Sequence, residues 1–137
     1  MTPAENQQRL VDELTVVPDA FEILNALVSR TKKLEPLPPS ERLEPFLVHG
    51  CQSELWIVPQ HDPDTALWTF RPGSDAPVVL ALGQLYSSIF SGCSAADITA
   101  FTPTLLEDLD LTRVITQNRQ HGARQIIAKI KAYVARP

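Results

Sequence analysis

Residues 48–58 read VHGCQSELWIV, in which two short apolar segments flank a small polar turn. Gly50 relaxes the backbone ahead of Cys51, because glycine adopts conformations that other residues avoid. Gln52 and Ser53 follow the cysteine and offer side-chain hydrogen bonds within a turn. These residues place a thiol where it can face outward, and we interpret the segment as a reactive-cysteine loop between two strands.

A reactive cysteine must be partly exposed, and its surroundings must favour the thiolate through backbone N–H groups, a cation or a helix N-terminus. The turn around Cys51 can supply backbone N–H groups. The alternative is a small buried hydrophobic residue, which is common for a free cysteine. The polar turn favours a functional role for Cys51. Cys93 follows a serine and a glycine at a predicted helix end, and we expect it to pack in the core.

The composition narrows the class of protein. A chain of 137 residues predicts a single domain over 1–137 that buries a core without disulfides or metals. The net charge is −4 and the twelve Lys and Arg residues are scattered, which disfavours nucleic acid as a partner. The sequence has neither a signal-peptide pattern nor an apolar run long enough for a membrane span. We therefore expect a cytoplasmic protein whose cysteines are thiols.

Capping residues and apolar spacing predict helices along most of the chain. The predicted helices begin after Thr2 and after Asp19, span residues 76–90 and 94–100, and begin again at Thr102 and Thr116. The second helix is expected to carry Phe21 in its buried stripe. The third, with Ser74 and Asp75 as its cap, is apolar enough to be the central helix that covers the sheet.

Three strands are predicted at residues 46–49, 54–59 and 65–71. Residues 60–64 contain Asp and Pro and separate the last two strands, which should form an antiparallel hairpin. A proline-rich stretch over residues 35–45 forbids regular helix and is expected to be a semi-rigid connector. The order of elements predicts an α+β fold, with a small three-stranded antiparallel sheet packed by helices.

Other catalytic or metal sites have no recognisable motif in the sequence. There is no phosphate-binding glycine loop, nucleophile elbow or HExxH helix. The three histidines and two cysteines lack the spacing of metal ligands, so no metal site is predicted.

Arg119 lies in the first turn of the helix that begins at Thr116. A cation there faces the positive end of the helix dipole, which costs a few tenths to about 1 kcal/mol. Such a placement suggests a task, either anchoring a loop or meeting an anion. The alternative is an ordinary solvated arginine, and position alone favours neither.

The segment GCQSELWIV at residues 50–58 resembles the GCQSxVW signature of the SufE family, which includes the paralogue CsdE. The resemblance continues at residues 73–76, which match the segment before the family's long helix, and at Arg119 with Gly122. These motifs lie in the family's order and spacing over nearly the whole chain. The resemblance implies a SufE/IscU-like fold.

The resemblance also implies transpersulfuration. A cysteine desulfurase of the SufS or CsdA kind, which uses pyridoxal phosphate, forms a persulfide on its own cysteine, and Cys51 accepts the terminal sulfur. Arg119 would stabilise the loop or the charge of the sulfur, and Asp75 would belong to the surface that supports the loop or docks the partner. Gly50 and the two polar residues after Cys51 would support the loop, and the chain needs no cofactor of its own.

Several alternatives stay open. The acceptor stimulates the desulfurase and passes sulfur to an iron–sulfur scaffold, or it is a CsdE-type acceptor that feeds another sulfur pathway. A regulator that docks on a desulfurase without carrying sulfur is a different class. A stand-alone cysteine hydrolase is disfavoured because no His-plus-acid set accompanies Cys51. We therefore expect a transpersulfuration partner rather than an independent enzyme, and the resting pose of the loop is left open.

Overall fold

A three-stranded antiparallel sheet lies at the centre of the computed structural model, which describes residues 1–135. The strands, in spatial order, are β1 (Trp56–His61), β2 (Leu67–Gly73) and β3 (Cys93–Ser94). β1 pairs with β2 along its whole length, and β3 pairs with the first two residues of β2. The predicted α+β fold class is confirmed.

The predicted strand over residues 46–49 is wrong. This segment begins at the end of a 3-10 turn, η3 (Glu44–Phe46), and contributes only one bridge, between Leu47 and Trp56. The Phe46 and Leu47 N–H groups donate to the Leu43 and Glu44 carbonyls at this turn, so they cannot also donate to a strand ladder. The third strand is β3 instead, so Cys93, which was expected at a helix end, lies in the sheet.

The predicted hairpin is confirmed, but both strands end two residues further along the chain than expected. Its turn is formed by residues 62–66 rather than 60–64. The backbone N–H of Ala66 donates to the Asp62 carbonyl at 2.7 Å, and Ala66 adopts a left-handed φ of 62°. This bond within the turn helps to fix where pairing starts, and the positions of Asp and Pro in the sequence do not reveal it.

Helices make up most of the remaining described chain. The α-helices are α1 (Pro3–Leu14), α2 (Ala20–Arg30), α3 (Pro77–Phe90), α4 (Ala95–Ala100), α5 (Leu105–Asp108) and α6 (Gln117–Ala135). Further 3-10 turns are η1 (Thr31–Lys33), η2 (Pro39–Glu41) and η4 (Leu111–Arg113). The predicted cap of α1 is confirmed, because the Glu5 N–H donates to the Thr2 hydroxyl at 3.1 Å. None of the described helices is both long and apolar enough to cross a membrane.

Three details of the helix predictions are wrong. α3 begins at Pro77, and the residue at its N-cap makes no side-chain hydrogen bond, so Ser74 and Asp75 do not cap it. α5 begins at Leu105, later than expected. Phe21 is 67 % exposed, because α2 turns other apolar residues toward the core.

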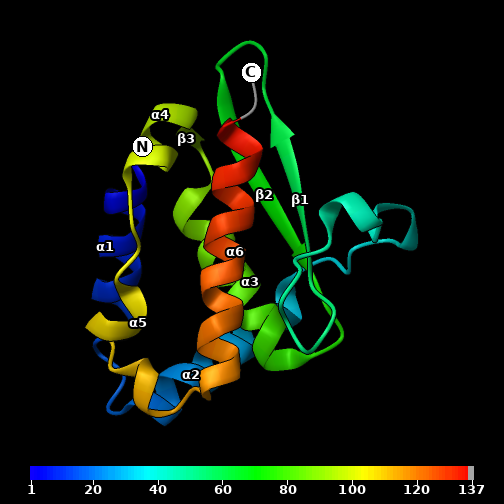
Figure 1. Ribbon diagram of the computed structural model, residues 1–137. Coiled ribbons are helices and arrows are strands. Elements are labelled where there is room, and N and C mark those ends of the chain that lie inside the picture. Colours follow the sequence, from blue (N-terminus) through cyan, green and yellow to red (C-terminus); the bar gives the residue numbers. More distant parts are fainter. Residues whose placement is uncertain (136–137) are drawn as a thin grey trace.

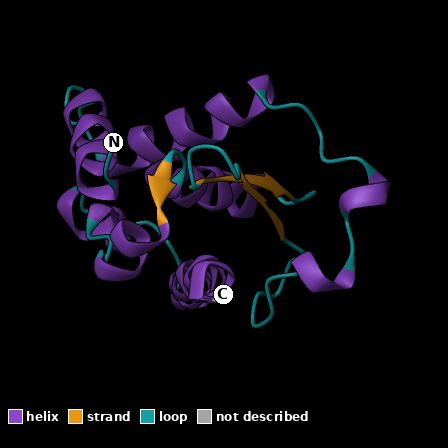
Figure 2. Ribbon diagram, turned by 90° about the horizontal axis from the view of Figure 1, so that it is seen from above, coloured by secondary structure: helices purple, strands orange, loops and turns teal. Residues whose placement is uncertain are grey.

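Helices cover one face of the sheet, and the connector lies on the other. Figure 1 shows α6 (orange to red) passing in front of α3, beside β1 and β2, and Figure 2 shows α6 nearly end-on beside the strands. α3 packs on β2, while α6 packs on β1 and α3. The main core includes Ile57, Phe70, Leu82, Ile89, Ile126 and Ile130. Residues alternate between faces along a strand, so Trp56 and Val58 form a smaller cluster with Leu37 of the connector.

Candidate functional site

The Cys51 loop, residues 49–54, leaves the core between two buried residues. Val48 is 3 % exposed and Leu55 is 0 % exposed, and the Val48 N–H donates to the Leu55 carbonyl at 2.8 Å. In the described part of the chain, residues 50–53 form no hydrogen bond. The loop is therefore held by a hydrogen bond at its base and elsewhere by packing alone. Its middle can move without breaking a hydrogen bond.

Gly50 brings the loop against α6. Its φ of 92° lies in the left-handed region that glycine favours. A Cβ atom at this position would lie 3.0 Å from Gln125 Cγ and 3.3 Å from His121 Nε2. Both the backbone conformation and the close approach to α6 therefore require glycine, immediately before Cys51.

The Cys51 thiol is half-buried in a pocket of about 240 Å³ between the loop, α3 and α6. The apolar lining comes from Val79 and Leu82 of α3 and from Ile126 of α6. The polar lining comes from Gln52, Thr116, Asn118 and Arg119. The sulfur reaches α6 at Gly122, where a Cβ atom would lie 3.2 Å from Cys51 Sγ.

Two opposing effects act on the Cys51 thiol. Burial raises its pKa above the usual 9.0, because an apolar environment disfavours the thiolate, and burial is the larger effect. The positive charge of Arg119 lowers the same pKa. The resting thiol is therefore mostly protonated at neutral pH, with one cation placed to favour the thiolate.

Arg119 is held by its backbone, which leaves its side chain available. The Thr116 hydroxyl accepts the Arg119 backbone N–H at 3.2 Å, which supports the predicted cap of this helix. Over residues 1–135 the Arg119 guanidinium has no hydrogen-bond or ion-pair partner. The structure thus places Arg119 and Cys51 in one pocket, and the roles assigned to them stay predictions.

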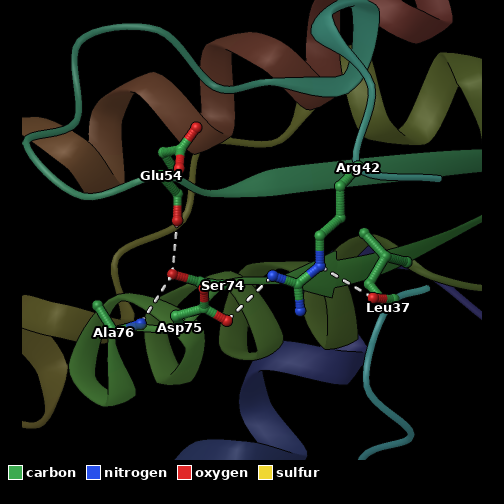
Figure 3. A network of polar contacts seen from close by, with 6 residues as sticks. All are labelled: Leu37, Arg42, Glu54, Ser74, Asp75 and Ala76. Carbon is green, nitrogen blue, oxygen red and sulfur yellow. Dashed lines mark hydrogen bonds and ion pairs between the residues drawn. The ribbon is translucent and has the colours of Figure 1, made fainter. Parts of the chain in front are cut away.

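Asp75 and Ser53 lie away from this pocket. Together with Glu54 and Ala76 they line a separate depression. The Asp75 carboxylate pairs with Arg42 of the connector, with Nη1 and Oδ1 at 3.0 Å, as Figure 3 shows. The structure therefore brings Gln52 and Arg119 to the thiol, but neither Ser53 nor Asp75, although all were predicted site residues.

Sequence reasoning missed the polar contacts of two residues near the loop: Ser74, which holds the end of the loop, and Arg42, which pairs with Asp75 (Figure 3). The Ser74 hydroxyl donates to the Glu54 carbonyl at 2.6 Å and accepts the Ala76 N–H at 3.2 Å, which ties the loop to the start of α3. Arg42 also donates to the Leu37 carbonyl at 2.9 Å. The available signals were an arginine in a proline-rich connector and a serine next to Asp75.

Cys93 lies in a different setting. It is 0 % exposed in β3, its Sγ lies 3.6 Å from Asn6 Nδ2, and burial raises its pKa to about 11. The expectation that it packs in the core is confirmed, and both cysteines are free thiols. Among the residues described, no group of three or more His, Cys, Asp or Glu side chains is placed to hold a metal ion. The site thus offers one partly exposed sulfur beside one cation, which suits nucleophilic attack by the thiolate.

Comparison with known proteins assigns the chain to a family. Residues 8–134 match the SufE model, described as an Fe-S metabolism associated domain. The chain belongs to the SufE family. Membership assigns it in general to sulfur transfer in iron–sulfur metabolism and implies a cysteine desulfurase as a partner.

Individual SufE-like relatives match almost the whole chain. An uncharacterized SufE-like protein of Rhizobium meliloti (strain 1021) is 27 % identical over 127 residues, covering 90 % of this chain and 91 % of the relative. Another, from Rhizobium etli, is 24 % identical over 126 residues, covering 90 % and 85 %. The solution structure of a hypothetical protein from Thermus thermophilus has a TM-score of 0.77 at 20 % identity, covering 98 % and 96 %. This last likeness shows a shared fold.

Proposed function

We propose that Cys51 accepts sulfur from the persulfide of a cysteine desulfurase and so stimulates that enzyme for iron–sulfur cluster assembly in the cytoplasm. The observation that carries the proposal is the half-buried thiol beside an unpaired Arg119, on a loop whose middle forms no hydrogen bonds in the described chain. Such a thiol is shielded from oxidation at rest and can be presented when a partner docks.

The chemistry is an exchange at sulfur. The Cys51 thiolate attacks the terminal sulfur of the partner's persulfide; a new S–S bond forms on Cys51 as the partner's S–S bond breaks, and the partner's cysteine leaves as a thiolate. No net oxidation occurs, so this chain needs no cofactor, and pyridoxal phosphate belongs to the desulfurase. The positive charge of Arg119 favours both the attacking thiolate and the persulfide anion.

The direct test is the intact mass of the protein after incubation with a desulfurase of the same organism and L-cysteine. We expect the mass of one sulfur atom to be added and then removed by a reductant. Cys51→Ser should lose the addition, whereas Cys93→Ala should keep both the addition and the stimulation. Equal sulfur acceptance by Cys51→Ser would overturn the proposal.

A regulator that carries no sulfur is the second candidate, and the raised pKa of the resting Cys51 thiol is the observation that favours it. Stimulation of the desulfurase that is undiminished in Cys51→Ala would support this alternative. The downstream acceptor, either an iron–sulfur scaffold or the acceptor of another sulfur pathway, is tested by adding each to the persulfidated protein and following the loss of the sulfur mass.

A further inference from the structure

We propose that Gly122 is a positioning residue that seats the Cys51 sulfur against α6 and sets how far the thiol is exposed at rest. The effect of this contact on sulfur transfer rests on the proposed function. The contact between Gly122 and the Cys51 sulfur is a property of the resting protein alone. Nothing in the backbone of α6 requires glycine at this position, so the reason for it lies in the contact with the loop.

Gly122 has an ordinary helical backbone within α6. The residue is buried, lies inside the helix, and is absent from the positive-φ glycines, which are Gly50 and Gly92. Alanine could adopt the same helical conformation, and it stabilises a helix interior more than glycine does. A glycine here therefore weakens α6 locally without any conformational need.

The sulfur of Cys51 occupies the place that a side chain on Gly122 would need. A Cβ atom on Gly122 would lie 3.2 Å from Cys51 Sγ, which is shorter than an ordinary van der Waals contact. Apart from the chain neighbours and the backbone of α6 itself, no other heavy atom of the described residues lies within 4 Å of that position. The sulfur alone fills the space that an alanine methyl group would need.

The loop is the part that would yield. Residues 50–53 form no hydrogen bond within the described chain, whereas α6 is a continuous helix packed on α3 and β1. An alanine at position 122 would therefore move the sulfur of Cys51 outward and leave the helix in place.

The burial of the sulfur, rather than the charges near it, determines the sign of the effect on the Cys51 pKa. α3 contributes only the apolar Val79 and Leu82 to the pocket. α6 contributes Arg119, and His121 beside Gly50, while the loop carries His49 and Glu54. Moving the sulfur outward reduces its burial, which is the larger cause of its raised pKa, so the thiolate should form at lower pH.

The first experiment measures alkylation of Cys51 by iodoacetamide between about pH 6 and about pH 10, in a Cys93→Ala background so that only Cys51 reports. We expect Gly122→Ala to react at least about threefold faster at neutral pH, with its pH profile moved to lower pH. Gly122→Ser serves as a second variant of similar size. An unchanged rate and an unchanged pH profile would overturn the inference.

The second experiment is a double-mutant cycle read by thermal unfolding. In a Cys51→Ala background nothing opposes the new methyl group, so Gly122→Ala should raise the Tm by about 3 to 6 °C. With Cys51 present, the gain should be smaller or reversed. The same Tm shift in both backgrounds would contradict the seating contact. Neither experiment uses a desulfurase, so failure of sulfur acceptance is distinguished from failure of this inference.

Discussion

Cys51 and Cys93 are the same side chain in two opposite settings. Cys93 is enclosed in the core, where its Sγ lies 3.6 Å from Asn6 Nδ2, whereas Cys51 is half-buried on a loop that is held only at its base. Burial raises the pKa of both thiols, and Arg119 opposes the rise at Cys51. The two thiols therefore differ more in their access to reagents, and in how firmly their segments are held, than in the effect of burial on their pKa values.

Access should give the largest difference between the two thiols. Cys93 can react only when the surrounding core opens, so we expect iodoacetamide to modify Cys51 at least about a thousandfold faster at neutral pH. Peptide mass spectrometry over a time course measures both rates in one sample, and a sub-denaturing urea series provides the control. Comparable alkylation rates would show that β3 opens locally and that the two thiols do not differ in access.

Alkaline pH should reveal the burial of Cys93. Its pKa is about 11 in the folded protein against 9.0 for an ordinary thiol, so the unfolded chain loses this proton first as the pH rises. The contribution of the protonated Cys93 thiol to the unfolding free energy is fully present below about pH 9. It falls by about 2 to 3 kcal/mol by about pH 11.

Urea unfolding of the natural protein and of Cys93→Ala at several pH values measures this linkage, because the other titrating groups are common to both. The difference in unfolding free energy between the two proteins should shrink through this pH window. A difference independent of pH would show that the Cys93 thiol is not buried as described. Cys51→Ala is the matched control and should show a weaker dependence.

Ser74→Ala should accelerate the alkylation of Cys51 more than that of Cys93, which responds only through the loss of global stability. The substitution removes the hydroxyl that donates to the Glu54 carbonyl at 2.6 Å, at a cost of about 1 kcal/mol in unfolding free energy. The end of the Cys51 loop loses its tie to α3, so we expect faster hydrogen exchange around the loop and faster alkylation of Cys51. Ser74→Thr keeps a hydroxyl and should behave like the natural protein. Equal acceleration at both cysteines would indicate general destabilisation instead.

Arg119→Gln should produce the smallest effect, and again at Cys51 alone. Removing the positive charge raises the pKa of the Cys51 thiol, so alkylation at neutral pH should slow by about threefold. Arg119→Lys retains the charge and should keep most of the rate, while Cys93 should not respond to either variant. A rate unaffected by Arg119→Gln would show that the guanidinium does not act on this sulfur.

Local patterns predicted the parts of the fold that depend on neighbours in sequence. The helix starts at Thr2, Ser94 and Thr116 correctly placed α1, α4 and α6. β3 could not be found in this way, because two residues carry no periodicity. Its position depends on a distant strand, since the Gly92 N–H donates to the Trp68 carbonyl at 2.7 Å.

The site was predictable to a similar extent. The turn residues and the resemblance pointed to Cys51, and the unusual place of Arg119 at a helix start pointed to the cation that lines the same pocket. The position of Asp75 was not predictable, because its partner Arg42 lies in a connector without regular spacing. Contacts between segments far apart in sequence cannot be predicted from a local sequence pattern.

α6 also carries contacts beyond the pocket. The Lys129 ammonium donates to the Pro45 carbonyl at 2.7 Å, and the Tyr133 hydroxyl donates to the Ile57 carbonyl at 2.7 Å, on either side of the Cys51 loop. Each helical residue advances by about 1.5 Å and turns by about 100°. Deleting one residue between Gly122 and Lys129 would therefore rotate the two halves of α6 by about 100° relative to each other. Between Gly122 and Lys129, α6 should therefore tolerate substitutions far better than insertions or deletions.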